Sequence, residues 1–222
     1  MDDNSKTNQA NYFAISLDDI IRDTTDEYLD SLDIDNPPEP KMIRFELLQT
    51  IRNNVELYNV SITKSKKIPC PRQLTESQIA HIILRLYPIV NIDFSGNADE
   101  ESEDKDFDAT VLAIYDKDTG LYSTSTKTFY KLIEQYRYNL RDYDFKEIMA
   151  IMSKKAPVRG RCSDPNLSIV NNGIFDYKTK QLMTFSPDYI FTSKTSVNYN
   201  PNATNVVIHN PDDGTDWDVE SW

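Results

Sequence analysis

The sequence predicts an α+β fold that is mainly helical and carries two small β-hairpins. Several segments place apolar residues three and four positions apart, which is typical of helices with one buried face. Two other segments alternate between two faces on either side of a short polar turn, which is typical of hairpins. Hydrophobic residues make up 39% of the 222 residues, with 13 Tyr and 9 Phe, so the chain can bury one sizeable core.

Residues 1–40 are expected to form an acidic N-terminal arm with one helix. Ser16 is placed to cap a helix from Leu17 to about Leu32, with Asp19 as the acid of a capping box. The prolines that follow prevent the helix from continuing. The acidic residues of the arm either form a solvated helix face, as charge runs usually do, or dock on the basic surface of a partner.

Residues 41–74 are expected to form a helix followed by a basic linker. The helix runs from Lys41 to about Tyr58 and keeps the helical spacing of apolar residues. The linker, from Ser61 to Arg72, carries positive charges and no acidic residue. Its cations are Lys64, Lys66, Lys67 and Arg72.

Residues 75–203 are expected to form the main domain. Thr75 and Gln78 make a capping box for a helix from Glu76 to Tyr87, and an acidic loop follows from Gly96 to Asp108. The first hairpin has a buried strand over Asp108–Asp116, a turn with Gly120 in the left-handed position, and a return over Leu121–Ser123. Two helices are then predicted over Phe129–Tyr138 and Phe145–Lys155.

The second hairpin is predicted over Gly173–Phe185, with a polar turn at Lys178-Thr179-Lys180. Asn172-Gly173 before its first strand supplies a backbone site that can take positive φ. No nucleophile stands beside a base in this stretch, so its residues indicate a scaffold rather than catalytic chemistry.

The order of residues in the two hairpins resembles a known family. The motifs are Asn172-Gly173-Ile-Phe-Asp176, Phe185-Ser-Pro187, Val197-Asn-Tyr199-Asn-Pro201-Asn-Ala203, and Tyr115-Asp116 followed by Gly120. Together, from about Asp108 to Ala203, they resemble the N-terminal accessory domain of phage, plasmid and poxvirus primase–helicases. The positions that match as structural motif residues are Tyr115, Asp116, Gly120, Asn172, Gly173, Asp176, Pro187, Tyr199 and Pro201. One departure is Lys180, where family members often have glycine.

The resemblance implies a non-catalytic domain that directly precedes a superfamily-three helicase ATPase and helps it assemble or handle DNA during replication. The implied partners are the C-terminal helicase domain of the same polypeptide, DNA that is single-stranded or forked, and further copies in a hexameric ring. ATP and Mg²⁺ are expected for that helicase and no cofactor for this segment, because its five glycines form no phosphate-binding Gly-x-x-x-x-Gly-Lys-Ser/Thr loop. The expected source is a phage or other mobile element.

Residues 204–222 are expected to be a linker and the start of the helicase domain. Asp216 resembles an N-cap, and Trp217, Val219 and Trp222 have the spacing of the first turns of an amphipathic helix. Tryptophans at a frayed end would be a poor natural terminus, so the polypeptide is expected to continue.

Two basic clusters are candidates for DNA contact. The first basic cluster consists of Lys154, Lys155, Arg159 and Arg161, and the second of Lys64, Lys66 and Lys67 together with Arg72. The first either complements the dipole at a helix carboxyl end or contacts phosphates, with Tyr136, Tyr138 or Tyr143 as a stacking surface. The same two interpretations, structural or phosphate-binding, apply to the second.

Charge and composition exclude several other classes. A net charge of −12 argues against a general DNA-coating protein, although a local basic patch stays possible. Cys70, Cys162, His81 and His209 lack the spacing of a zinc site. No apolar run approaches the roughly 20 residues of a membrane span, and the acidic start is no signal peptide, so a soluble cytoplasmic protein is expected.

Two alternative functions remain open at this point. The net charge of −12 also suits a complete acidic interaction protein, a DNA mimic or docking module that binds a basic partner. Asp106 and Asp108 resemble the paired metal-binding aspartates of a primase, but they end an acidic loop, where solvated carboxylates are the simpler interpretation.

Overall fold

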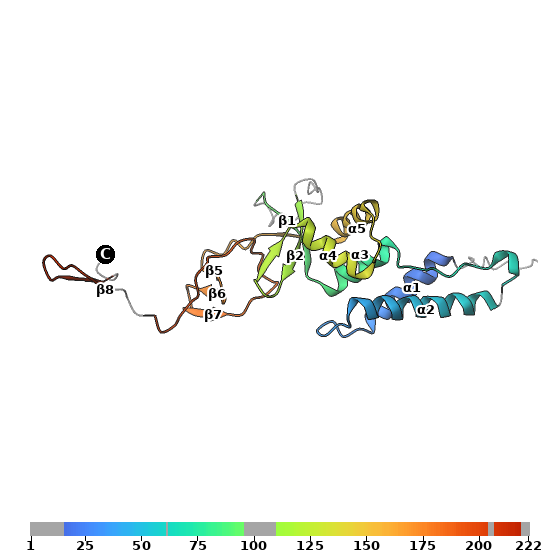
Figure 1. The fold of residues 1–222 in the computed structure, drawn as a ribbon, viewed down its shortest axis with the longest axis horizontal. Coiled ribbons are helices and arrows are strands. Elements are labelled where there is room, and N and C mark those ends of the chain that lie inside the picture. Colours follow the sequence, from blue (N-terminus) through green and yellow to red (C-terminus); the bar gives the residue numbers. More distant parts are fainter. Residues whose placement is uncertain (1–15, 61, 96–109, 204–206, 219–222) are drawn as a thin grey trace, which may run out of the picture. The chain divides into compact units, whose positions relative to one another are not determined.

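The computed structural model describes residues 16–60, 62–95, 110–203 and 207–218. The chain divides into two compact units. The first comprises Met1–Tyr115 and Ser123–Gly160, and the second comprises Asp116–Tyr122 and Arg161–Trp222. Helices and strands are both present, which confirms the predicted α+β fold class (Figure 1).

The first unit contains the α-helices, in the places that the apolar spacing predicts. They are α1 (Leu17–Asp30), α2 (Pro40–Val60), α3 (Glu76–Leu86), α4 (Thr126–Tyr136) and α5 (Asp142–Lys155), with a short 3₁₀ helix η1 (Lys64–Lys66) after α2. Both predicted capping boxes are present, at Ser16 with Asp19 and at Thr75 with Gln78. Each satisfies backbone N–H groups that a helix start leaves without an intrahelical acceptor.

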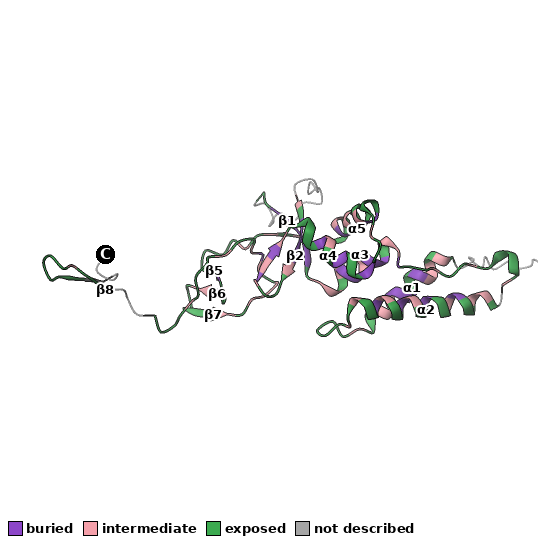
Figure 2. Cartoon of the chain, viewed as in Figure 1, coloured by how far each residue is buried: buried purple, intermediate pink, exposed green. Residues whose placement is uncertain are grey.

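The core of the first unit is built from one stripe of each helix. On α2 the fully buried residues are Ile43, Leu47, Ile51 and Val55, spaced four apart, and they lie along one side of the helix (Figure 2). They pack with the buried faces of the other helices, which include Ile79, Ile82, Ile83, Phe129, Ile133, Ile148 and Met152. Spacing of four residues aligns side chains along a helix, so the rest of α2 is free to face solvent.

Three strands of the first unit form a mixed sheet in the order β2-β1-β4, with β1 (Ile89–Asp93) in the centre. β2 (Thr110–Asp116) runs antiparallel to β1, and β4 (Val158–Gly160) runs parallel to it. β2 was predicted, whereas β1 and β4 were not. All five residues of β1 are buried, so its sequence lacks the alternation between apolar and polar positions that identifies a strand with one exposed face.

Asn91 explains how a polar residue occupies the centre of this sheet. Its side-chain nitrogen donates to the carbonyl oxygens of Ser153 and Ala156, at 2.7 and 3.0 Å. Those carbonyls lie at the carboxyl end of α5, where no intrahelical donor is left for them. Asn91 therefore links the central strand to the helix end.

The second unit is built around two similar hairpin turns. The first turn leads from β2 to β3 (Leu121–Ser123), as predicted. The second joins β6 (Gly173–Asp176) to β7 (Gln181–Met183), also as predicted, and β5 (Leu167–Val170) adds an unpredicted antiparallel strand beside β6. Ile174 and Ile190 are buried in this unit.

The helix predicted to begin at Asp216 is wrong for the residues that the structure describes. Asp216–Asp218 is strand β9, which pairs antiparallel with β8 (Val207–His209) across a turn at residues 210–214. Gly214 takes φ +71 in that turn and its N–H donates to the Asn210 carbonyl, so local turn chemistry outweighs the N-cap signal. Val219 and Trp222 lie outside the described residues. Over the described part of the chain, no helix combines the length and apolarity that a membrane span requires.

Candidate nucleic-acid interface

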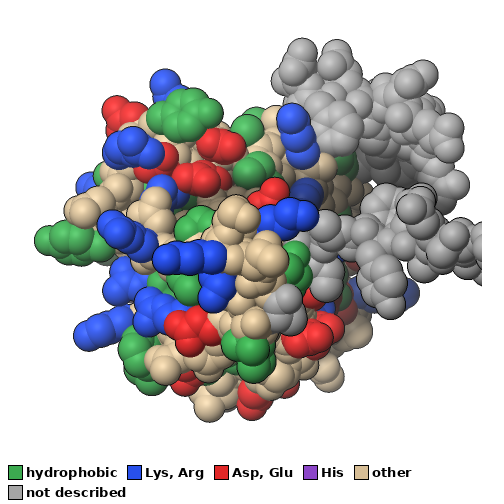
Figure 3. All heavy atoms as spheres, turned by 90° about the vertical axis from the view of Figure 1, so that its right-hand side faces the viewer, with side chains coloured by type: hydrophobic (Ala, Val, Ile, Leu, Met, Phe, Trp, Pro, Cys, Tyr) green, Lys and Arg blue, Asp and Glu red, His purple; other side chains and the backbone are tan. Residues whose placement is uncertain are grey.

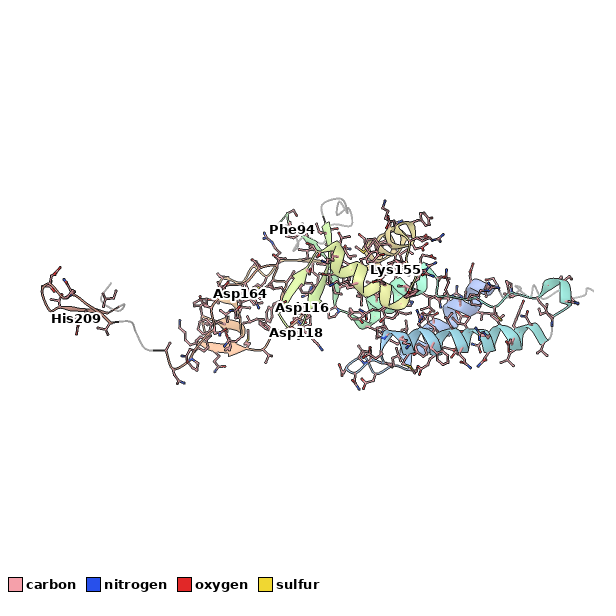
Figure 4. The ribbon with its side chains drawn as sticks, viewed as in Figure 1. Phe94, Asp116, Asp118, Lys155, Asp164 and His209 are labelled. Carbon is pink, nitrogen blue, oxygen red and sulfur yellow. The ribbon has the colours of Figure 1, made fainter. Side chains whose placement is uncertain are left out.

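The first basic cluster is divided between the two units. Lys154 and Lys155 are exposed on the last turn of α5 and Arg159 is exposed on β4, whereas Arg161 belongs to the second unit. Lys155, labelled in Figure 4, borders a hollow of about 430 Å³ that Asp18 and Asp26 also line. These two carboxylates reduce the positive potential available to a phosphate there.

The second basic cluster is exposed at and after η1. Lys64, Lys66 and Lys67 all face solvent. Figure 3 looks onto the first unit from the side where α2 finishes, and Lys and Arg side chains gather toward one side of that face. Exposed lysines in this arrangement can attract a phosphate backbone, but they form no enclosed site.

A third surface, which the sequence interpretation missed, is a groove of about 570 Å³ in the first unit, here called the α2 groove. One wall is the outward face of α2, and the other consists of the segment before α3 and the connection from α4 to α5. Its lining residues are Lys41, Met42, Arg44, Phe45, Leu48, Gln49, Arg52, Arg72, Gln73, Tyr136, Arg137, Tyr138 and Asn139.

The lining of the α2 groove is cationic. It contains no acidic residue among the residues that the structure describes, although the whole chain has a net charge of −12. Four of its cations, Lys41, Arg44, Arg52 and Arg72, have no carboxylate within ion-pair distance in the described ranges. Their charge is therefore available to an anionic ligand.

Arg137, the fifth cation of the lining, has a different role. It is buried, and its guanidinium forms ion pairs with Glu76 and with Asp144, the latter at 3.7 Å. Asp144 is 1% exposed and also pairs with Arg141 at 3.0 Å. Hydrogen bonds from Arg141 hold the pKa of Asp144 below its ordinary value. This network fixes the backbone just before Tyr138 and leaves little of the Arg137 charge for a ligand.

Two aromatic rings of the groove are exposed. Phe45 is 62% exposed on α2, and Tyr138 is 81% exposed after α4. Tyr136, which was predicted as a stacking residue, is only 1% exposed and belongs to the core. Tyr143, 71% exposed on α5, does not line the groove. Of the three predicted tyrosines, the structure therefore places Tyr138 alone as an exposed ring in this groove.

A helical projection would have revealed part of the α2 groove. Lys41, Arg44, Phe45, Leu48, Gln49 and Arg52 are three or four residues apart, which places them on one face of α2 beside its buried stripe. Arg72 and Tyr138 join them only through the tertiary fold. The sequence carries no local signal for that meeting.

The motif residues of the two hairpins build the same turn twice. Asp116 accepts the N–H of Asp118 on one carboxylate oxygen and the hydroxyl of Thr119 on the other, at 3.0 and 2.9 Å (Figure 4). Asp176 accepts the N–H of Lys178 and the hydroxyl of Thr179 in the same way, both at 2.8 Å. Hydrogen bonds from Thr179 and Lys178 also lower the pKa of Asp176.

The residue after each threonine is left-handed, with φ +72 at Gly120 and φ +59 at Lys180. Lys180 thus occupies the backbone conformation that glycine adopts without strain. The departure from the family pattern changes the residue and leaves the turn geometry the same.

Asn172 and Tyr199 connect the second hairpin to the segment after it. The side chain of Asn172 accepts the N–H of Tyr199 and donates to its carbonyl, both at 2.9 Å. The Tyr199 ring stacks on Phe175 with 4.6 Å between ring centroids. Gly173 is needed because a Cβ there would lie 2.9 Å from a Leu182 methyl carbon and closer still to the Met183 carbonyl oxygen.

The remaining motif residues have structural contacts or lie at the surface. The Pro187 carbonyl accepts the hydroxyl of Tyr122 at 2.7 Å, and the Tyr115 N–H donates to Pro88 at 2.9 Å. Pro201 is exposed in a turn. Tyr115 and Pro187 thus each contribute a backbone hydrogen bond to the fold, and their roles as structural motif residues stay a prediction.

In the described ranges, no three His, Cys, Asp or Glu side chains gather closely enough to hold a metal ion. Asp106 and Asp108 lie outside those ranges. His209, labelled in Figure 4, pairs with Asp216 across the β8–β9 hairpin at 2.7 Å.

A family model of known proteins matches the chain. The family model described as "D5 N terminal like" matches residues 103–218, which is 116 of the 222 residues and thus just over half of the chain. The matched range includes both repeated turns and the β8–β9 hairpin. No curated protein matches the chain.

Proposed function

Because the chain belongs to the D5 N terminal like family, the N-terminal domain found in D5-type primase–helicases, we propose that it is a non-catalytic accessory domain that engages DNA during replication. The family match over residues 103–218 is the observation that supports a role in replication. In this proposal, ATP and Mg²⁺ bind to a helicase domain that cooperates with this chain, and the chain itself binds neither.

The α2 groove is the surface that best supports contact with DNA. It combines four cations that have no acidic partner in the described part of the chain with an acid-free lining. An overall acidic protein gains no general affinity for a polyanion, so such binding has to be local. The first basic cluster is a further candidate that the same experiment separates, whereas the second already contributes Arg72 to the groove lining.

DNA binding by the purified chain tests the proposal, measured by fluorescence anisotropy at low and moderate salt. The triple variant Arg44→Gln/Arg52→Gln/Arg72→Gln is expected to lose most of the affinity. The matched control Lys127→Gln/Lys131→Gln/Lys146→Gln removes the same charge from exposed positions of α4 and α5 outside the groove, and it should bind like the wild type. A third variant, Lys154→Gln/Lys155→Gln/Arg159→Gln, tests the first basic cluster.

The opposite results are also clear. Binding that survives in the groove variant would move the contact elsewhere. If the chain does not bind DNA but binds a basic replication protein with an affinity that falls as salt rises, the result would support the acidic docking module. ATP turnover by the 222 residues would contradict the non-catalytic role.

A further inference from the structure

The composition of the α2 groove suits the binding of bases as well as phosphates. Three of the four available cations are arginines, whose planar guanidinium groups can bind phosphate through two hydrogen bonds and can also stack on a base. A surface that only tracked the charge of a duplex would not need exposed rings, because the faces of paired bases are covered by their neighbours.

The two exposed rings come from different segments that line the groove. Phe45 projects from the outward face of α2, and Tyr138 lies on the α4–α5 connection. Neither ring contributes to the core, since they are 62% and 81% exposed. Exposed rings beside cations are the usual means of holding unpaired bases by stacking, and this contact tolerates any base sequence.

Amide side chains complete the lining. Gln49, Gln73 and Asn139 border the same groove and offer both hydrogen-bond donors and acceptors. The edges of unpaired bases present the same mixture of donors and acceptors, which pairing would otherwise occupy. Arginine, amide and aromatic side chains without an acid thus fit the phosphates, edges and faces of one strand.

Buried ion pairs of Arg137 hold the α4–α5 connection, which includes Tyr138, in place. Arg137 is fixed between Glu76 on α3 and Asp144 on α5, immediately before Tyr138. Arg137 is therefore a positioning residue, and its buried charge is already paired. The ring that follows it loses less conformational freedom on binding than a ring on an anchorless loop would.

We infer that the α2 groove is a binding site for single-stranded nucleic acid, in which Phe45 and Tyr138 stack bases while Arg44, Arg52 and Arg72 bind the phosphates. This inference rests on the proposed function, which requires only that the groove contacts DNA. It adds that the groove discriminates a single strand from a duplex and that the aromatic rings cause the discrimination.

Anisotropy with labelled oligonucleotides of about 20 nucleotides, longer than the usual site sizes, tests the inference. The probes are oligothymidylate, a duplex of the same length, and oligouridylate, which shows whether DNA or RNA is preferred. We expect the wild type to bind the single strand at least about tenfold more tightly than the duplex. Phe45→Leu and Tyr138→Leu should each weaken single-strand binding about 5- to 150-fold, the range of one lost stacking contact, with little change for the duplex.

Matched variants separate stacking from charge and from folding. Tyr143→Leu removes a tyrosine outside the groove whose exposed fraction, 71%, lies between those of Phe45 and Tyr138, and this variant should bind like the wild type. The triple arginine variant should weaken binding of both forms and reduce the salt dependence of single-strand binding by about two logarithmic units per decade of salt. Thermal unfolding of each variant shows whether the fold is retained, and Phe45 and Tyr138 are too exposed for their loss to affect it.

The possible failures are distinguishable. If the arginine variant loses affinity while the leucine variants bind both forms as the wild type does, the single-strand inference is overturned and the proposed DNA contact stands. If the arginine variant binds every probe as tightly as the wild type, the groove is not the interface and both proposals fail.

Discussion

Gly120→Ala should destabilise the second unit by about 2–4 kcal/mol. The backbone at Gly120 has φ +72, and a left-handed residue with a Cβ costs roughly 1–2 kcal/mol. The new Cβ would also lie 2.7 Å from Cγ and 2.9 Å from Cε1 of Phe185, and overpacking of this kind costs about 1–3 kcal/mol. Reduced freedom of the unfolded chain offsets these costs by roughly 0.4–1 kcal/mol.

Urea unfolding followed by near-ultraviolet circular dichroism measures this change, and hydrogen exchange locates it. The N–H of Tyr122, which donates to Phe191 at 2.8 Å, is the nearest reporter. Gly214→Ala is the matched control, because Gly214 has φ +71 and no atom within 4 Å of its would-be Cβ. It should show the backbone cost alone. A Gly120→Ala protein within about 0.5 kcal/mol of the wild type would refute the packing of Phe185 against this turn.

Three further changes have definite expected results. Lys180→Gly relieves a left-handed lysine at φ +59 and should stabilise the second hairpin by about 0.5 kcal/mol in urea unfolding, whereas Lys180→Ala should not. Asn91→Ala leaves the Ser153 and Ala156 carbonyls without their donor, and a loss of about 2–3 kcal/mol is expected; a loss below 0.5 kcal/mol would be contrary to that role. Asp144 has a lowered pKa, so its stabilisation is complete above the ordinary value of 3.8 and disappears as the pH falls through the lower folded value. Asp144→Asn should therefore be less stable than the wild type at pH 7 and approach it in acid, and a constant difference at every pH would contradict the ion pairs.

Local chemistry made much of the fold predictable. Ser16 with Asp19 and Thr75 with Gln78 mark helix starts because each pair satisfies its own backbone donors within four residues. Gly120 marks a turn because its conformation is strained for other residues. Signals of this kind are complete within a short stretch of sequence, so they hold without knowledge of the tertiary structure.

The unpredicted strands β1 and β4 depend on distant residues. β1 and β4 are short strands that pair with each other across more than sixty positions, and Asn91 is acceptable in β1 only because α5 ends beside it. β1 and β4 are fixed by long-range partners, whereas propensity within the segment decides little. The strand at Asp216 is fixed locally instead, because it pairs with His209 across the turn that contains Gly214.

The candidate site shows the same division. Lysine and arginine clusters that are adjacent in sequence were found at once, yet Arg161 belongs to a different unit from Lys154. The α2 groove gathers side chains from three separate segments, and only the face of α2 could have been drawn from the sequence. Exposure also had to come from the structure, since Tyr136 and Tyr138 are two residues apart and have opposite environments.

The second unit draws on two separate stretches of the chain, and this limits how the protein can be dissected. The hydroxyl of Tyr122 donates to the carbonyl of Pro187, and its N–H donates to the carbonyl of Phe191. Tyr122 itself belongs to the shorter stretch of the unit, whereas the longer stretch begins only at Arg161. A fragment that begins after Gly160 would lack this tyrosine together with the turn at Gly120. Truncation series and limited proteolysis divide a protein at single points along the sequence. They would therefore report this unit as unstable even if it folds stably when both stretches are present. Joining the two stretches through a new linker in a rearranged gene is the route to producing it intact.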